Sequence, residues 1–134
     1  MKNCLFCKII NGDIPCYKVY ENDDVLAFLD INPESYGHTL VIPKKHFDCY
    51  EDIDFDTIKK VNEVGKIVYN KIKTNLHADG IRLVQNNGII QDVKHYHLHL
   101  VPIYKNDKDD KDDFDVVLKN ITKQHLKKQV FNIN

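Results

Sequence analysis

Three histidines alternate with aromatic or aliphatic residues over residues 95–100, and this alternation restricts the possible folds more than any other feature of the sequence. Successive side chains of a β-strand point to opposite faces of a sheet, so His95, His97 and His99 share one face. The residues between them face the core. We therefore expect a sheet that buries one face and presents three imidazoles, on a rigid support, toward an exposed or cleft-like surface.

The rest of the sequence predicts an α+β fold around that strand. Alternating apolar residues and turn sequences predict an antiparallel meander sheet, and apolar residues at every third or fourth position predict one long helix and a C-terminal packing helix. The expected strands cover residues 16–21, 25–31, 38–43, 81–87 and 94–104, and the expected helices cover residues 54–75 and 115–130. At 134 residues the chain fits a single domain, 1–134, in which the charged run 105–115 is a solvated loop.

Charge and hydropathy exclude several classes of partner. The chain has 19 Lys and Arg against 20 Asp and Glu, a net charge of -1, so no global field attracts nucleic acid or an anionic membrane. No run of about 18 apolar residues occurs, and the first residues are too poor in apolar side chains for a secretory signal. We expect a cytoplasmic protein without nucleic-acid or membrane partners.

The histidine row has three chemical interpretations: surface imidazoles without a function, a His-x-His metal chelate, or a nucleophilic imidazole with supporting neighbours. At about 3.3 Å per residue, His95 and His99 lie about 13 Å apart along a straight strand, too far to bind one ion together. Composition does not decide between the remaining interpretations, although charge-tuned chemistry is typical of functional histidine clusters.

The segment QDVKHYHLHLVP, residues 91–102, resembles the His-x-His-x-His motif of the histidine triad family, in its Hint-like branch. The resemblance continues through the N-terminal half, CLFCKIINGDIPCYKVYENDDVLAFLDINPESYGHTLVIPKKHF, and covers residues 4–104, leaving 105–134 as charged loop and C-terminal helix. It implies the fold of that family, a homodimer, and an enzyme that binds a purine nucleotide or nucleotide conjugate and transfers or hydrolyses nucleotidyl groups.

The resemblance also implies roles for three histidines. His97 matches the family nucleophile, which attacks the α-phosphorus and forms a transient nucleotidyl-histidine; a neutral imidazole offers one unprotonated nitrogen for this step. His99 matches a phosphate-contacting position, and His38 matches an additional histidine beside the triad. Either one donates hydrogen bonds to phosphate oxygens or assists proton transfer, and the sequence does not divide these two roles.

Further residues match the nucleotide site of the family. Asn86 and Gln91 match amide side chains around the phosphates, where donors that do not titrate suit negative charge. Asp30 matches a ribose-binding carboxylate, and its neighbours Phe28 and Ile31 are candidates for lining the base pocket. Outside the resemblance, residues of these types are equally typical of turns, strand ends and cores.

The sequence departs from the family pattern in front of the triad. Many members carry Gly-Gln followed by Ser or Thr at this point, whereas this chain has Ile90, Gln91 and Asp92. An anionic Asp92 beside a phosphate repels it unless the side chain points away, is protonated or is paired. This departure bears on substrate choice.

Cys4 and Cys7 form a Cys-x-x-Cys pair, and the resemblance implies that His46 and His95 complete a zinc site found in some bacterial relatives. Two cysteines and two histidines give a closed tetrahedral site, so such zinc is structural and the chemistry needs no metal. Without the resemblance, the pair is interpreted equally well as two free thiols or a redox pair.

We therefore expect a nucleotidyl hydrolase or transferase of the phosphoramidase type, which acts on the α-phosphate of nucleoside phosphoramidates or related conjugates through His97. The alternatives are a dinucleoside polyphosphate hydrolase with the same nucleophile, a non-enzymatic nucleotide sensor or interaction module, and a metal-dependent hydrolase that uses His97 and His99 as ligands.

Overall fold

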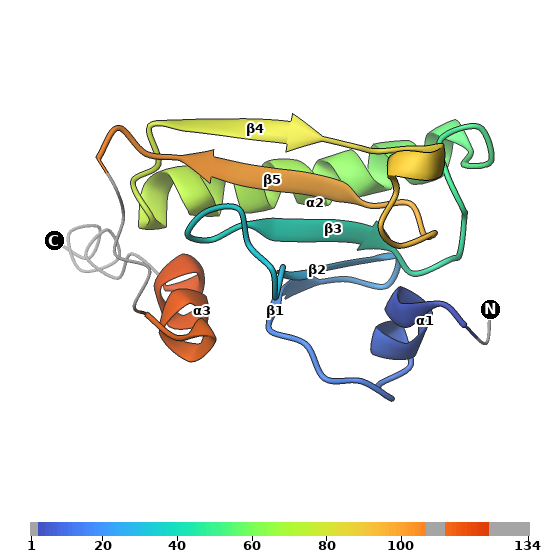
Figure 1. Ribbon diagram of the computed structural model, residues 1–134, viewed down its shortest axis with the longest axis horizontal. Helices are drawn as coiled ribbons and strands as arrows, with labels where there is room; N and C mark the ends of the chain where they lie inside the picture. The colour runs from blue at the N-terminus through green and yellow to red at the C-terminus, as the bar shows by residue number, and fades with distance from the viewer. Residues whose placement is uncertain (1–2, 107–111, 124–134) are drawn as a thin grey trace, which may run out of the picture.

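A computed structural model describes residues 3–106 and 112–123 of the chain (Figure 1). One antiparallel sheet has the strand order β1-β2-β3-β5-β4. Its strands are β1 (Lys18–Glu21), β2 (Val25–Leu29), β3 (Thr39–Pro43), β4 (Gly80–Val84) and β5 (Leu98–Ile103). The helices are α1 (Leu5–Ile10), α2 (Phe55–Asn75) and α3 (Phe114–Thr122), and η1 (Gly88–Ile90) is a single 3₁₀ turn. The expected α+β fold is confirmed.

The long helix α2 covers one face of the sheet (Figure 1). It begins after Asp54, whose carboxylate caps the helix by accepting a hydrogen bond from the Thr57 N–H at 3.2 Å. The apolar stripe of α2 packs on the inward side chains of the strands, and the core between them includes Val61, Val64, Val68, Ile72, Val25, Ala27, Val41, Leu98 and Leu100. This core fixes the backs of β3 and β5, so the histidines on their other side stand on a rigid support.

The short helix α1 lies on the opposite face of the sheet, which is the face that carries the histidines. Its Phe6 is buried in a second apolar cluster with Leu26, Phe28, Leu40 and Ile42. His95, His97 and His99 are only 0%, 1% and 7% exposed. Of the two expected surfaces, the exposed one is therefore wrong, because burying the apolar residues of this face under α1 also covers the imidazoles of His95 and His97.

The chain bends in front of β5, so the strand expected at 94–104 is shorter than predicted. The His95 N–H donates to the Val93 carbonyl at 2.9 Å, and the Tyr96 N–H donates to the Phe47 carbonyl at 2.7 Å. These residues pair with loop backbone instead of β3. The alternation survives the bend, since Tyr96 belongs to the α2 core while the histidines lie on the α1 side.

The last helix, α3, packs against α2 and β1 and ends at Thr122. The helix predicted to 130 is confirmed only in its first part, and residues 124–130 lie outside the described residues. Within the expected loop 105–115, α3 already begins at Phe114, because Asp113 caps it. None of the helices in the described part of the chain has the length and apolar character needed to cross a membrane.

Candidate functional site

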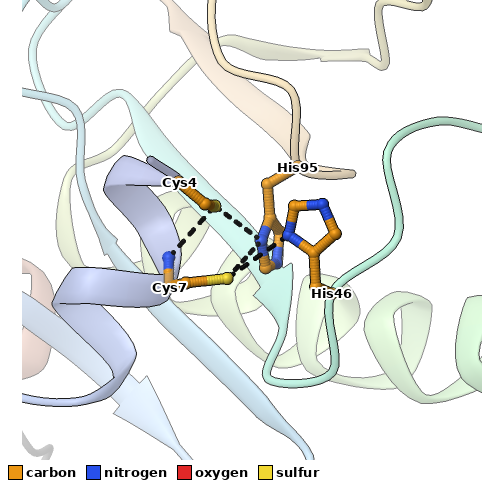
Figure 2. Close-up of side chains that lie close together, drawn as sticks. All are labelled: Cys4, Cys7, His46 and His95. Atoms are coloured by element: carbon orange, nitrogen blue, oxygen red, sulfur yellow. Dashed lines mark hydrogen bonds between the residues drawn. The ribbon is translucent and has the colours of Figure 1, made fainter. Parts of the chain in front are cut away.

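Four side chains from three separate segments of the chain lie close together (Figure 2). Cys4 caps the N-terminus of α1 and Cys7 lies within it, while His46 comes from the loop after β3 and His95 from the bend before β5. Their sulfur and Nδ1 atoms all lie within 4.8 Å of one another. We call these four residues the Cys/His cluster.

The distances within the Cys/His cluster match those expected around a tetrahedral ion. The sulfurs of Cys4 and Cys7 lie 3.3 Å and 3.6 Å from the Nδ1 atom of His95. Cys7 Sγ also lies 3.3 Å from the Nδ1 atom of His46. Zn–S bonds of about 2.3 Å and Zn–N bonds of about 2.0 Å place sulfur and nitrogen ligands about 3.5 Å apart. The donor set and its spacing therefore fit zinc.

Hydrogen bonds on the outer side of each imidazole leave the correct nitrogen facing the thiols. His95 Nε2–H donates to the Pro43 carbonyl at 2.8 Å, and His46 Nε2 lies 2.7 Å from a carboxylate oxygen of Asp48. Each ring therefore carries its proton on Nε2 and turns an Nδ1 lone pair inward. Burial lowers the pKa of His95 to about 4, which keeps that ring neutral and able to bind a metal.

His97 is the next histidine of the row. In His97 it is Nε2, and not Nδ1 as in His95, that makes no hydrogen bond to a backbone carbonyl. Its Nδ1–H donates to the carbonyl of His95 at 2.7 Å, because a carbonyl only accepts. In the neutral ring Nε2 then carries the lone pair. This atom is buried and has no hydrogen-bond partner within residues 3–106 and 112–123. A buried polar atom without a partner costs free energy, so this nitrogen is a candidate contact for a ligand.

His38 and His99 form a hydrogen-bonded chain that ends in a second unpartnered nitrogen. The Glu34 N–H donates to His38 Nδ1 at 3.1 Å, so His38 carries its proton on Nε2. That proton is donated to His99 Nδ1 at 3.0 Å, which leaves the proton of His99 on Nε2. Burial lowers the pKa values of both rings, so both are neutral. His99 Nε2–H is a buried donor without a partner among the described residues.

The two unpartnered nitrogens therefore have complementary roles. The rings of His97 and His99 lie 4.7 Å apart, centre to centre. One presents a lone pair and the other presents an N–H, which suits an electrophilic phosphorus and one of its oxygens. In this chain of hydrogen bonds His99 presents an N–H and His38 orients the ring that carries it. The catalytic roles expected of the two histidines stay predictions.

Asp30 lies at the end of β2, beside His38. One of its oxygens accepts from the Asn32 N–H at 2.9 Å and the other lies 3.5 Å from His38 Nε2. Both residues line a cavity of about 470 Å³ between the loop after β2 and the start of α3. Ile31 is 65% exposed, and Phe28 packs under α1 against Phe6, outside that cavity.

The loop before the triad is held by amide side chains. The Gln91 amide donates to the Asp48 carbonyl and its oxygen accepts from the Gly88 N–H at 3.3 Å. Gln85 and Asn87, which the sequence reasoning missed, hydrogen bond to each other across Asn86. In the structure Gln91 thus fixes the loop, and the phosphate contacts expected of Gln91 and Asn86 stay predictions. Their common amide chemistry was the only signal in the sequence.

Asp92 does not point away from the site. A carboxylate oxygen lies 3.3 Å from His97 Nε2, without the geometry of a hydrogen bond, and the side chain is 74% exposed. Its other constraint is a hydrogen bond from the Val93 N–H at 3.0 Å. A carboxylate therefore lies beside the unpartnered Nε2 atom of His97.

Two further groups of donors lie close enough for a metal: Asp30 with His38 and His99, and Asp92 with His97 and His99. In both groups the positions of the histidine ring protons disfavour metal binding, because a metal needs a ring nitrogen with a free lone pair. In the first group, His38 Nε2 and His99 Nδ1 share a hydrogen bond with each other, so neither nitrogen has a free lone pair for a metal. In the second, His99 Nε2 carries a proton that cannot move to Nδ1 unless the hydrogen bonds through His38 to Glu34 are also lost. The Cys/His cluster is the group whose lone pairs face inward.

Comparisons with known proteins agree with this geometry. A family model described as HIT domain matches residues 11–106. The chain is 47% identical to a HIT-like protein of Methanocaldococcus jannaschii over 107 residues, 78% of this chain and 81% of that protein. It is 40% identical to adenosine 5'-monophosphoramidase hnt1 of Schizosaccharomyces pombe, over 75% of this chain and 74% of that protein. Among solved structures, a zinc-bound histidine triad family protein of Mycobacterium smegmatis superposes with a TM-score of 0.84 at 33% identity, covering 99% of both chains.

Proposed function

Because this chain belongs to the histidine triad (HIT) domain family, we propose that it is a Hint-like nucleotidyl hydrolase of the phosphoramidase type with His97 as its nucleophile. The observation that supports this most directly is the Nε2 lone pair of His97, buried without a hydrogen-bond partner beside the Nε2–H of His99. The similarity to an adenosine 5'-monophosphoramidase supports a substrate with a P–N bond.

The reaction takes two displacements at the α-phosphorus. His97 Nε2 forms a bond to phosphorus, and the P–N bond breaks with its electron pair on the leaving nitrogen, which takes up a proton from water. The His95 carbonyl, which accepts from His97 Nδ1–H, stabilises the positive charge that develops on the ring. His99 Nε2–H donates to a phosphoryl oxygen. Water then attacks phosphorus, releases the nucleoside monophosphate and restores His97.

The remaining assignments follow the same proposal. Asp30 accepts hydrogen bonds from the ribose hydroxyls, and Asn86 donates to a phosphate oxygen. The exposed Ile31 belongs to the base site, where it is free to contact a purine. Phe28, which is buried against Phe6 outside the cavity, is assigned only a supporting position beneath that site. The competing metal-dependent mechanism needs His99 as a ligand, and the proton on its Nε2 disfavours that role.

We also propose that the Cys/His cluster holds a structural zinc ion. Bound there, zinc supplies a closed four-ligand link between α1 and the sheet and leaves no open position for substrate. Metal analysis of the purified protein tests this directly. About one zinc per chain, lost together with thermal stability in a strong chelator, is expected.

A homodimer in the cytoplasm and a single domain over 1–134 complete the proposal. α2 and the edge strand β4 form an apolar groove of about 340 Å³ lined in part by Gly65, Tyr69, Leu83 and Leu98. Leu83 is 49% exposed, which suits an edge that pairs with a second copy. Light scattering on the purified chain tests the dimer.

The decisive experiment is intact-mass spectrometry after brief mixing with adenosine 5'-phosphoramidate, with quenching at neutral to alkaline pH to preserve the P–N bond to histidine. We expect a nucleotidyl adduct and AMP release in the wild type and neither in His97→Ala. If AMP were released from diadenosine polyphosphates but not from the phosphoramidate, the leaving group would be a nucleotide and the protein would be a dinucleoside polyphosphate hydrolase. If nucleotide binds but no conjugate reacts, the protein is a sensor and the proposal fails.

A further inference from the structure

The helix α1 joins the Cys/His cluster to the nucleophile through a residue that carries no reactive group. Phe6 lies between Cys4 and Cys7 in the sequence and is 4% exposed. Its ring centre lies 5.1 Å from that of His97 at an interplanar angle of 89°, and 5.8 Å from that of His95 at 70°. One apolar side chain therefore packs edge-to-face on both imidazoles.

α1 depends on its contacts for its position. It has six residues, fewer than a helix needs to be stable on its own in water. On one side the thiols of Cys4 and Cys7 hold it to His95 and His46, and on the other Phe6 holds it to the sheet through Phe28, 5.5 Å away. The position of the Phe6 ring is therefore tied both to the thiols and to the sheet.

A second connection runs through the backbone. The ring of His95 belongs to the Cys/His cluster, and its carbonyl accepts the Nδ1–H of His97 at 2.7 Å. This hydrogen bond determines which nitrogen of His97 keeps its lone pair. The packing of Phe6 and the carbonyl of His95 thus fix the two properties that a nucleophilic imidazole needs: the orientation of the ring and its tautomer.

We propose that Phe6 is a positioning residue for His97, and that α1 makes the reactivity of His97 depend on the state of the Cys/His cluster. The proposal rests on the proposed function, because it concerns the first displacement at phosphorus. It states that loss of the cluster slows formation of the nucleotidyl-histidine without abolishing nucleotide binding. An error of about 1 Å in the position of a reacting group costs about 100-fold in rate, so packing on one face of the ring is enough to matter.

The first test replaces the packing residue and leaves all ligands and histidines in place. In Phe6→Ala we expect single-turnover adduct formation from adenosine 5'-phosphoramidate to fall about 100-fold. Zinc content and AMP affinity should stay within twofold of the wild type. The nitrogen NMR shifts of His97 should move toward a mixture of tautomers. Phe6→Leu keeps the apolar contact without the flat ring and should lose about 10-fold.

The matched control is Ile9→Ala, which removes packing from the same helix and the same apolar cluster. We expect it to lower thermal stability while leaving the adduct rate and the His97 shifts unchanged. Equal rate losses in Ile9→Ala and Phe6→Leu would overturn the positioning role, since both would then reflect weaker packing of α1. If Phe6→Ala does not fold, the comparison of Phe6→Leu with Ile9→Ala still decides.

The second test is a double-mutant cycle between Phe6→Leu and the pair Cys4→Ser with Cys7→Ser. If α1 transmits the state of the cluster, the combined rate loss is smaller than the product of the separate losses, because both changes release the same contact. Independent losses that multiply would contradict the coupling. A wild type that forms no adduct at all would instead refute the proposed function, so the two failures are distinguishable.

Discussion

The Cys/His cluster and the pair formed by His97 and His99 both take histidines from one row on the same face of the sheet, yet these histidines present different ring nitrogens. In the cluster, His95 donates from Nε2 to a carbonyl and turns an Nδ1 lone pair toward two thiols. His97, two residues further along the chain, donates from Nδ1 to the His95 carbonyl and presents Nε2. His99 accepts at Nδ1 and presents an N–H.

The difference shows that the partner of the second nitrogen, and not the histidine itself, decides the role of each ring. A backbone carbonyl fixes the proton on His95 and on His97, and His38 fixes it on His99. The two regions should therefore respond differently to substitution. Changes in the cluster should affect stability first, and changes around His97 and His99 should affect rate first.

The largest effect is expected from removing the thiols. Cys4→Ser with Cys7→Ser should lower the free energy of unfolding by about 5 kcal/mol, part of the about 10–16 kcal/mol that structural zinc contributes in small metal-dependent domains. Thermal denaturation with and without chelator measures this. Cys49→Ser, outside the cluster, should behave as the wild type. If the double variant were as stable as the wild type, the Cys/His cluster would not be a structural region distinct from the pair formed by His97 and His99.

The next effect concerns the donor beside the nucleophile. His99→Leu removes an N–H aimed at the phosphoryl oxygen, so the rate of adduct formation should fall about 100- to 1,000-fold. Stability should fall only modestly, because the variant removes one buried nitrogen without a partner but also leaves His38 Nε2–H without its acceptor. Single-turnover kinetics and thermal denaturation make the comparison. A large loss of stability with an unchanged rate would assign His99 to the structural region.

His38 provides a finer separation, because it acts on His99 and not on phosphorus. His38→Leu should reduce the adduct rate about 10-fold, as expected for partners that orient a functional ring. His38→Gln, whose amide N–H replaces the donor to His99 Nδ1, should recover most of the rate. Equal adduct rates for His38→Leu and His38→Gln would show that His38 does not determine the tautomer of His99.

Asp92 should give a smaller effect, in the direction of improvement. Two unit charges about 4 Å apart in water interact by about 1 kcal/mol, so Asp92→Asn should tighten AMP binding about fivefold. Asparagine keeps the acceptor for the Val93 N–H. Asp23→Asn, an exposed change of equal charge, is the control for calorimetric titration. Unchanged affinity would mean that the carboxylate swings clear of the phosphate.

The pH dependence of stability should include a contribution from His38 and His99. Burial lowers the pKa values of His38 and His99 in the folded protein, whereas the unfolded rings titrate at about pH 6.5. Below that pH the unfolded chain binds more protons, so the free energy of unfolding is full above about pH 6.5 and falls as the pH decreases toward the lowered values. Urea denaturation at several pH values measures the slope, and His38→Leu should reduce it. An equal slope in the variant would exclude His38 as a source.

Much of this arrangement is predictable from the sequence. The alternation at 95–100 gives the shared face, and the three- and four-residue spacing of α2 gives the opposing layer, because both patterns reflect local backbone geometry. Enclosure of the imidazoles under α1 was not predictable, since a helix of six residues carries almost no periodic signal. The position of Phe6 depends on contacts between residues far apart in the sequence.

The candidate residues themselves divide in the same way. The four members of the Cys/His cluster were expected together and lie together. The roles of His38 and His99 were not separable, because the proton positions depend on the Glu34 N–H, which no side-chain pattern encodes. Asp92 was recognised as an anomaly in the sequence, but its approach to His97 depends on the bend before β5.

The contact between Cys4 and His95 spans 91 positions of the chain, and that between Cys7 and His46 spans 39. Closing such loops costs entropy, and the contacts that repay this cost form only when both ends of each loop are present. α1 therefore reaches its final place only in a chain that extends through His95 and has folded its sheet.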